Sequence, residues 1–261
     1  RVAAALTDVF IDFEPIERPA GDPGAGHRHV VTKKLAGTQT TSLADYGDYD
    51  RKIWICRDPR DFLVSQSLYR WHREQPPEPI DQLWFDRVFE KLVTKESDPA
   101  SVSFLDLEPA NYFETLDAVA DLCRREIDDS WLVYRYEHMV DGDYRALNHY
   151  LGFEVEPEAE VARGLERVVR RKGYGDWRDW FTPADVAFYS SGGLQRYLCA
   201  FGYDGHDWQL NDPQSIDPEH GSRYMAALFN DHLSGTGDGR PDEERESTRN
   251  GRWFSLWSNR A

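Results

Sequence analysis

The stretch that decides the fold is KIWICRDPRDFLVS, residues 52–65. Its first five residues are an apolar run bounded by charges, a pattern typical of a strand buried on both faces of a parallel sheet. Pro59 then stands where a helix begins, and the apolar residues after it recur at helical spacing. The stretch therefore predicts a buried strand, a tight turn and a helix.

The same alternation recurs along the chain. Residues 131–136, WLVYRY, predict another strand, and the helix that follows it is expected to end at Gly152. A short strand is expected over 29–32. Further helices are expected over 81–95, 111–125, 157–170, 183–201 and 222–229. This alternation predicts an α/β fold, a single domain with a central parallel sheet flanked by helices and a ligand crevice at the carboxyl ends of the strands.

The first residues also show apolar side chains at helical spacing, so a helix is predicted over 2–13. No cap and no preceding strand are present to begin it. We therefore expect the chain to begin inside a helix, as an N-terminally truncated domain.

Composition limits the classes of partner. Among 261 residues, Lys+Arg number 31 and Asp+Glu 47, which gives a net charge of −16. Such a charge repels polyanions, so nucleic acid is not an expected partner and an anionic ligand needs a local basic site. No stretch reaches the roughly 20 apolar residues that span a bilayer, so no membrane partner is expected. The three cysteines lie in apolar surroundings without a CxxC pair, which favours buried thiols and a cytoplasmic location.

One candidate site lies at the turn between the buried strand and its helix. Arg57 ends the strand, and Ser65 follows eight positions later. A guanidinium fork, a hydroxyl and nearby helix-N-terminal amides suit a phosphate dianion. The alternative is that Arg57 pairs with Asp61 as a structural brace and that Ser65 is an ordinary residue on the helix face.

These residues resemble the 3′-phosphate-binding segment of the sulfotransferases that use 3′-phosphoadenosine 5′-phosphosulfate (PAPS). Two later segments resemble the same family in the right order. WLVYRYEHM, residues 131–139, resembles its strand ending in Tyr-Glu, and the run 171–182 contains its Arg-Lys-Gly, Gly-Asp-Trp and Phe-Thr elements. The chain departs from the family in having one spacer residue, Tyr174, where two are common. Three ordered matches favour the family over coincidence.

The resemblance implies a nucleotide-kinase-like, P-loop-like fold, with a sulfotransferase domain over 1–210 and a loop-rich extension over 211–261. It implies transfer of a sulfuryl group from PAPS, without a metal, to a hydroxyl or amine of a small-molecule, sugar or peptide acceptor, leaving adenosine 3′,5′-bisphosphate (PAP). It also implies an adenine contact at Tyr136 and a 3′-phosphate site formed by Arg57, Ser65, Arg171, Lys172 and Gly173.

Two parts of the family pattern are missing from the sequence. The Ser-Gly-Thr loop that holds the phosphosulfate is expected upstream of Arg1, because Ser234-Gly235-Thr236 follows no strand and predicts a flexible turn. Where many relatives have Lys-Thr-His, this chain has Thr-Lys-Lys-Leu at 32–35. Lys34 is therefore the first candidate for the catalytic group and His29 the second, although a strand-edge lysine and a loop histidine are often merely solvated.

Two alternative functions remain open. One is a noncatalytic or degenerate nucleotide-binding protein of the same fold, and the other is a nucleotide or small-molecule kinase, which would need a phosphate loop and a magnesium site. Several tryptophans either line an acceptor cleft or belong to the core, and the core is the commoner fate. They are Trp71, Trp84, Trp177, Trp180 and Trp208.

Overall fold

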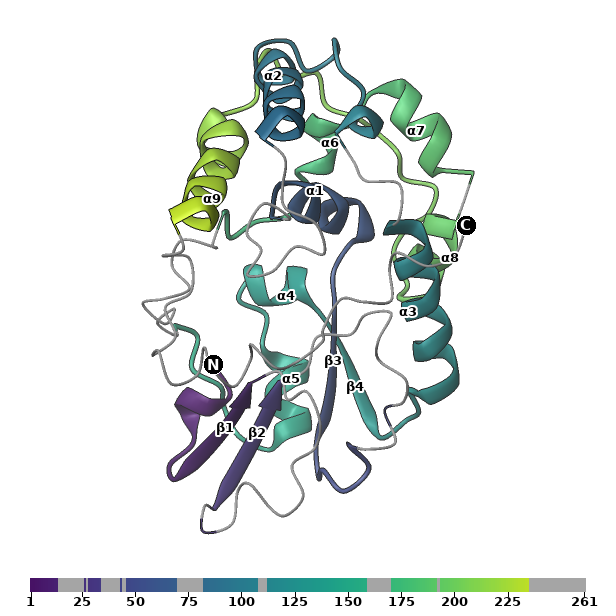
Figure 1. Cartoon of the computed structure of the whole chain (residues 1–261). Helices are drawn as coiled ribbons and strands as arrows, with labels where there is room; N and C mark the ends of the chain where they lie inside the picture. Colours follow the sequence, from purple (N-terminus) through teal and green to yellow (C-terminus); the bar gives the residue numbers. More distant parts are fainter. Residues whose placement is uncertain are drawn as a thin grey trace, which may run out of the picture. The chain divides into compact units, whose positions relative to one another are not determined.

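The computed structural model describes most of the chain, in two compact units (Figure 1). The described residues are 1–13, 26, 28–33, 43, 46–69, 82–107, 112–158, 170–191 and 193–234. Unit 1 comprises Arg1–Pro59, Ala110–Glu160 and Tyr189–Asp207, and unit 2 comprises Arg60–Pro109, Val161–Phe188 and Trp208–Ala261. The predicted division at residue 210 stays a prediction. No helix in the described ranges is long and apolar enough to cross a membrane.

The described residues of unit 1 contain two pairs of parallel strands. β1 (Val9–Phe13) pairs with β2 (His29–Lys33), and β3 (Lys52–Cys56) pairs with β4 (Trp131–Arg135). In the second pair the register joins Lys52 to Trp131 at one end and Cys56 to Arg135 at the other. Figure 1 shows β3 and β4 side by side, each followed by a helix. The parallel pairs and the helices between them confirm the predicted α/β class.

The predicted helix over 2–13 is wrong. A short 3-10 helix, η1 (Ala3–Ala5), is followed by strand β1. Val9, Phe10 and Ile11 are β-branched or aromatic residues, and they pair with β2. This pairing makes the segment a strand, although its apolar residues recur at helical spacing. η1 ends at the extended residue Leu6, and Asp8, which has a positive φ of 54°, precedes the strand and accepts the N–H of His29 at its carbonyl at 3.1 Å. The expectation of a phosphosulfate loop upstream of Arg1 depended on this predicted helix and therefore loses that support.

Both faces of the β3–β4 pair pack against helices of unit 1. Trp54 of β3 stacks on Phe201 at a centroid distance of 6.3 Å, just after α8 (Gly193–Ala200), which lies beside α3 (Tyr112–Glu126) in Figure 1. Tyr134 of β4 belongs to a second cluster with Leu147 and Val155. Trp54 and Cys56 share one face of β3 and are buried, whereas Ile55 on the other face is 60% exposed, so the predicted burial of β3 on both faces is wrong at Ile55.

Two short helices follow β4 in unit 1. α4 (Tyr136–Val140) begins at the first residue after the strand, so β4 ends one residue earlier than predicted. α5 (Arg145–Leu151) ends at Gly152, whose φ of +79° is the left-handed conformation that favours glycine at a helix end. The predicted end of this helix is confirmed.

Unit 2 is helical in the ranges that the structure describes. α1 begins with the last residue of unit 1, and α7 ends with a residue of unit 1. The helices are α1 (Pro59–Tyr69), α2 (Gln82–Ser97), α6 (Trp177–Trp180), α7 (Pro183–Tyr189) and α9 (Ser222–Ser234), with 3-10 helices η3 (Phe104–Asp106) and η5 (Pro218–His220). Phe85 of α2 stacks on Phe229 of α9 at a centroid distance of 3.9 Å, so these two helices pack against each other.

Several helix predictions need correction. The predicted helix over 183–201 is two helices, α7 and α8, because serine and glycine residues separate them. On α2, Leu83 and Trp84 are 65% and 45% exposed, whereas Phe85 is buried. Most of the predicted helix over 157–170 lies outside the described residues.

Buried carboxylates hold the helix ends of unit 2. Asp185, with no exposed surface, accepts the N–H groups of Phe104 at 2.9 Å, Leu105 at 3.0 Å and Thr182 at 2.7 Å. Thr182 and Asp185 thus form a reciprocal cap at the start of α7, and the same carboxylate caps η3. Glu96 of α2 accepts the hydroxyl of Ser222 at 2.6 Å, at the start of α9. These anions replace water at helix ends that are buried.

Candidate functional site

Arg57 and Tyr136 lie together at the paired ends of β3 and β4. The last paired residues of the two strands are Cys56 and Arg135, so the next residue of each chain segment leaves the sheet at the same edge. The guanidinium carbon of Arg57 lies 4.9 Å from the centroid of the Tyr136 ring. Both side chains are half-buried. The parallel pairing therefore brings together a cation and an aromatic face at the carboxyl ends of two strands, where α/β proteins commonly bind ligands.

Glu137 fixes the two turns that carry these side chains. Its Oε1 accepts the backbone N–H of Asp58 at 2.9 Å, and its Oε2 accepts the hydroxyl of Tyr203 at 2.8 Å. One carboxylate thus connects the turn after β3, the first turn of α4 and the segment after α8. Sequence reasoning included Glu137 in a motif but gave it no role, because neither partner is near it in sequence.

The surroundings of Glu137 are buried and polar. Arg135 donates from Nη2 to the carbonyl of Phe201 at 3.1 Å, and its guanidinium lies 4.7 Å from the Tyr203 ring centroid. Burial raises the pKa of the Tyr203 hydroxyl well above its usual range, so this group stays protonated and donates to Glu137. Burial likewise raises the pKa of the Cys56 thiol to about 11, which makes it a poor nucleophile.

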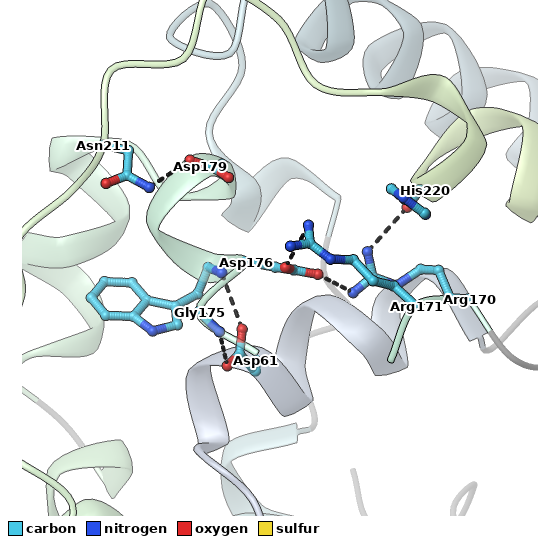
Figure 2. A network of polar contacts seen from close by, with 9 residues as sticks. Asp61, Arg170, Arg171, Gly175, Asp176, Asp179, Asn211 and His220 are labelled. Carbon is cyan, nitrogen blue, oxygen red and sulfur yellow. Dashed lines mark hydrogen bonds and ion pairs between the residues drawn. The ribbon is translucent and has the colours of Figure 1, made fainter. Parts of the chain in front are cut away.

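In unit 2, two arginines meet one aspartate. Arg170 Nη2 lies 2.7 Å from Asp176 Oδ2, and Arg171 Nη1 lies 3.0 Å from Asp176 Oδ1 (Figure 2). The Arg170 side chain is 6% exposed and also donates to the carbonyl of His220 at 3.2 Å, whereas the Arg171 side chain is 46% exposed. Arg170 is therefore held in the interior, and Arg171 reaches the solvent, where a ligand phosphate can meet it.

The same segment is tied to α1 by Asp61. This residue is 1% exposed, and its carboxylate accepts the backbone N–H groups of Gly175 at 2.6 Å and Trp177 at 3.2 Å. Gly175 has a φ of +83°, a conformation that favours glycine. A Cβ on residue 173 would lie 2.9 Å from Arg171 Nε, so a larger residue than Gly173 would displace that side chain.

Two of the tryptophans that the structure describes in unit 2 belong to its core. Trp177 and Trp180 are 1% and 2% exposed. The Arg60 guanidinium lies 4.1 Å from the Trp177 ring centroid and 5.0 Å from that of Trp208. Of the remaining tryptophans considered as cleft residues, Trp84 is partly exposed and Trp71 lies outside the described residues. Burial favours the core interpretation for Trp177 and Trp180.

The predicted site residues fall into separate parts of the chain. Arg57 and Tyr136 are brought together in unit 1. The other predicted nucleotide ligands belong to unit 2, where Ser65 is half-buried on α1, Arg171 and Lys172 are exposed and Gly173 is half-buried. Their shared role at one phosphate stays a prediction.

The two candidates for the catalytic group differ in what the structure shows. His29 is the first residue of β2, at the amino end of that strand, and its side chain is half-buried. Lys34 lies outside the described residues, so its role stays a prediction, as does that of His29. In the described part of the chain, no three His, Cys, Asp or Glu side chains gather as metal ligands would.

Comparisons with known proteins give one structural similarity. No family model matches the chain, and no curated protein matches it. Among solved structures, the chain is similar to mouse sulfotransferase SULT7A1 complexed with PAP, with a TM-score of 0.42 and 19% sequence identity over 75% of this chain and 79% of that one. PAP is there a ligand of the mouse protein. These comparisons assign neither a family nor a ligand to this chain.

Proposed function

We propose that this protein binds 3′-phosphoadenosine nucleotides and transfers the sulfuryl group of PAPS to a hydroxyl or amine acceptor. The observation that supports it best is the contact between Arg57 and Tyr136. The two residues lie 79 positions apart in the sequence. The family resemblance independently assigns Arg57 to the 3′-phosphate and Tyr136 to the adenine of the same nucleotide. Parallel pairing of β3 with β4 holds them 4.9 Å apart, as neighbouring parts of one ligand require.

Each side chain has the chemistry that its proposed partner needs. The Arg57 guanidinium can donate two parallel hydrogen bonds to phosphate oxygens. The Tyr136 ring offers an apolar face for a nucleobase. Glu137 restrains the backbone on both sides, so neither turn has to be ordered when a nucleotide binds.

The proposed reaction is an in-line displacement at sulfur. The acceptor oxygen or nitrogen forms a bond to sulfur, the bond from sulfur to the 5′-phosphate oxygen breaks, and PAP leaves with the electron pair. The acceptor's proton passes to a base, for which Lys34 is the first candidate and His29 the second. The net charge of −16 disfavours a highly sulfated polymer as the acceptor and favours a neutral or cationic molecule.

Calorimetric titration with PAP and with adenosine 5′-monophosphate tests the binding proposal. One charge-assisted hydrogen bond contributes about 1.5–3 kcal/mol, so PAP is expected to bind about ten- to a hundredfold more tightly in the wild type. Arg57→Ala should remove most of that preference. Arg51→Ala is the matched control, because Arg51 makes the same kind of contact, 5.6 Å from the Tyr150 ring, at the start of β3. Equal wild-type affinities would overturn the proposal.

Transfer is tested separately from binding. The protein is incubated with PAPS and a metabolite extract, and mass spectrometry searches for products that are heavier by one sulfuryl group. Sulfated products that need both the protein and PAPS support the enzymatic proposal. Selective binding of PAP without any such product would favour the noncatalytic nucleotide-binding alternative.

A further inference from the structure

We propose that Asp61 is a positioning residue for the Arg171–Gly173 segment. Its carboxylate fixes the turn at 175–177 and thereby the direction from which Arg171 meets a ligand phosphate. This inference rests on the proposed function, since it concerns the basic segment that is expected to bind the 3′-phosphate. It assigns to Asp61 a role that the sequence did not indicate, because its partners lie 114 and 116 positions away.

The carboxylate of Asp61 is committed to the backbone of this turn. It is 1% exposed and accepts the N–H groups of Gly175 at 2.6 Å and Trp177 at 3.2 Å, so the two residues that flank Asp176 are both fixed. The preceding residue, Arg60, covers the Trp177 ring at 4.1 Å. Two consecutive residues of α1 therefore hold both the backbone and the indole of the turn.

A chain of short contacts leads from this turn to Arg171. Asp176 stands between the two fixed residues, and Figure 2 shows Arg170 and Arg171 both directed at its carboxylate. Because Asp176 is 4% exposed and held from both sides, it acts as a fixed anchor for the arginines. Arg170 stays buried on it, while the more exposed Arg171 can turn towards a phosphate at little cost in ordering. Loss of the Asp61 contacts should therefore loosen Arg171 and reduce its contribution to phosphate binding.

Asp185 provides a matched control within the same unit. Like Asp61, it is a buried aspartate that accepts backbone N–H groups, here those of Phe104, Leu105 and Thr182. None of these partners belongs to the 171–177 segment. Asp185→Asn is therefore expected to lower stability without disturbing Arg171, which separates positioning from a general loss of stability.

The experiment compares the wild type, Asp61→Asn and Asp185→Asn as full chains. An asparagine can accept only one of the two N–H groups and turns its amide donors towards the other. We expect Asp61→Asn to lower the affinity for PAP by about tenfold and to leave that for adenosine 5′-monophosphate unchanged. Hydrogen exchange without ligand should speed up at Gly175 and Trp177 in this variant alone. Asp185→Asn should keep the preference for PAP.

A second variant covers the case in which Asp61→Asn does not fold. A Cβ on residue 175 would meet no atom within 4 Å, but its φ of +83° strains any residue other than glycine. Gly175→Ala thus disturbs the turn while leaving every buried charge in place, and it should also reduce the preference for PAP.

The outcomes distinguish this inference from the proposed function. If the wild type prefers PAP and both Asp61→Asn and Gly175→Ala keep that preference, the positioning role is overturned and the proposed function stands. If Asp185→Asn loses the preference as fully as Asp61→Asn does, stability explains the loss and the role is overturned. If the wild type shows no preference, the proposed function fails and the role of Asp61 fails with it.

Discussion

Removal of the Tyr203 hydroxyl tests whether Glu137 fixes the turns of the candidate site. The hydroxyl donates to Glu137 Oε2 at 2.8 Å, and a hydrogen bond to a charged group contributes about 1.5–3 kcal/mol net. Glu137 is only half-buried, so water can replace part of that interaction in the variant. Tyr203→Phe is therefore expected to lower the free energy of unfolding by about 1.5 kcal/mol, the lower end of the range.

A double-mutant cycle separates this contact from other effects. Glu137→Met removes the acceptor of both the Asp58 N–H and the Tyr203 hydroxyl and makes no new hydrogen bond, so this change should cost about 3 kcal/mol. Urea unfolding of the wild type, both single variants and the double variant gives the coupling energy, for which we expect about 1 kcal/mol. A coupling energy within the additivity error, about 0.3 kcal/mol, would refute the claim that Glu137 and Tyr203 act together.

Three further predictions concern buried groups. Asp185→Ala leaves three backbone N–H groups without this acceptor and should lower the free energy of unfolding, measured by urea denaturation, by about 3–5 kcal/mol. A loss below about 1 kcal/mol would contradict the capping role. Iodoacetamide should alkylate the exposed Cys199 first and reach Cys56 and Cys123 only in denaturant. Burial raises the thiol pKa of Cys56 to about 11 and that of Cys123 to about 12. Early labelling of either buried thiol, measured by peptide mass spectrometry, would contradict the prediction. Burial lowers the pKa of Lys95 from 10.5 to about 8, so the unfolded chain binds more protons than the folded chain between these pH values. The free energy of unfolding of the wild type, relative to that of Lys95→Met, should therefore rise by about 3 kcal/mol from pH 8 to 10.5. Urea titrations that show no change of this difference with pH would contradict the prediction.

The sequence predicted the parts of the fold that depend on local patterns. The apolar run of β3, the proline at the start of α1 and the glycine after α5 each lie where their patterns indicate. Arg57 and Tyr136 could be selected because each lies at the end of a predicted strand, in a segment that resembles the PAPS-dependent sulfotransferases. Their 4.9 Å contact required the pairing of β3 with β4, which alternation of strands and helices suggested only in general terms.

Other features could not be predicted because their partners are distant in sequence. β1 has apolar residues at helical spacing, and only its pairing with β2 decides for a strand. Asp61 and Asp185 look in the sequence like ordinary acids in the first turn of a helix, where they would favour the helix dipole. The structure shows instead that each is buried and binds backbone N–H groups of another segment.

The central claim is that the ends of β3 and β4 bind an adenosine 3′-phosphate. Hydrogen exchange of the full chain, with saturating PAP and with saturating adenosine 5′-monophosphate, tests it most directly. We predict that PAP slows exchange in the peptides that cover residues 55–58 and 135–138, and that the monophosphate slows it much less in the first of them, because it lacks the group that Arg57 binds. Protection confined to other segments, or equal protection of both peptides by the two nucleotides, would contradict the claim.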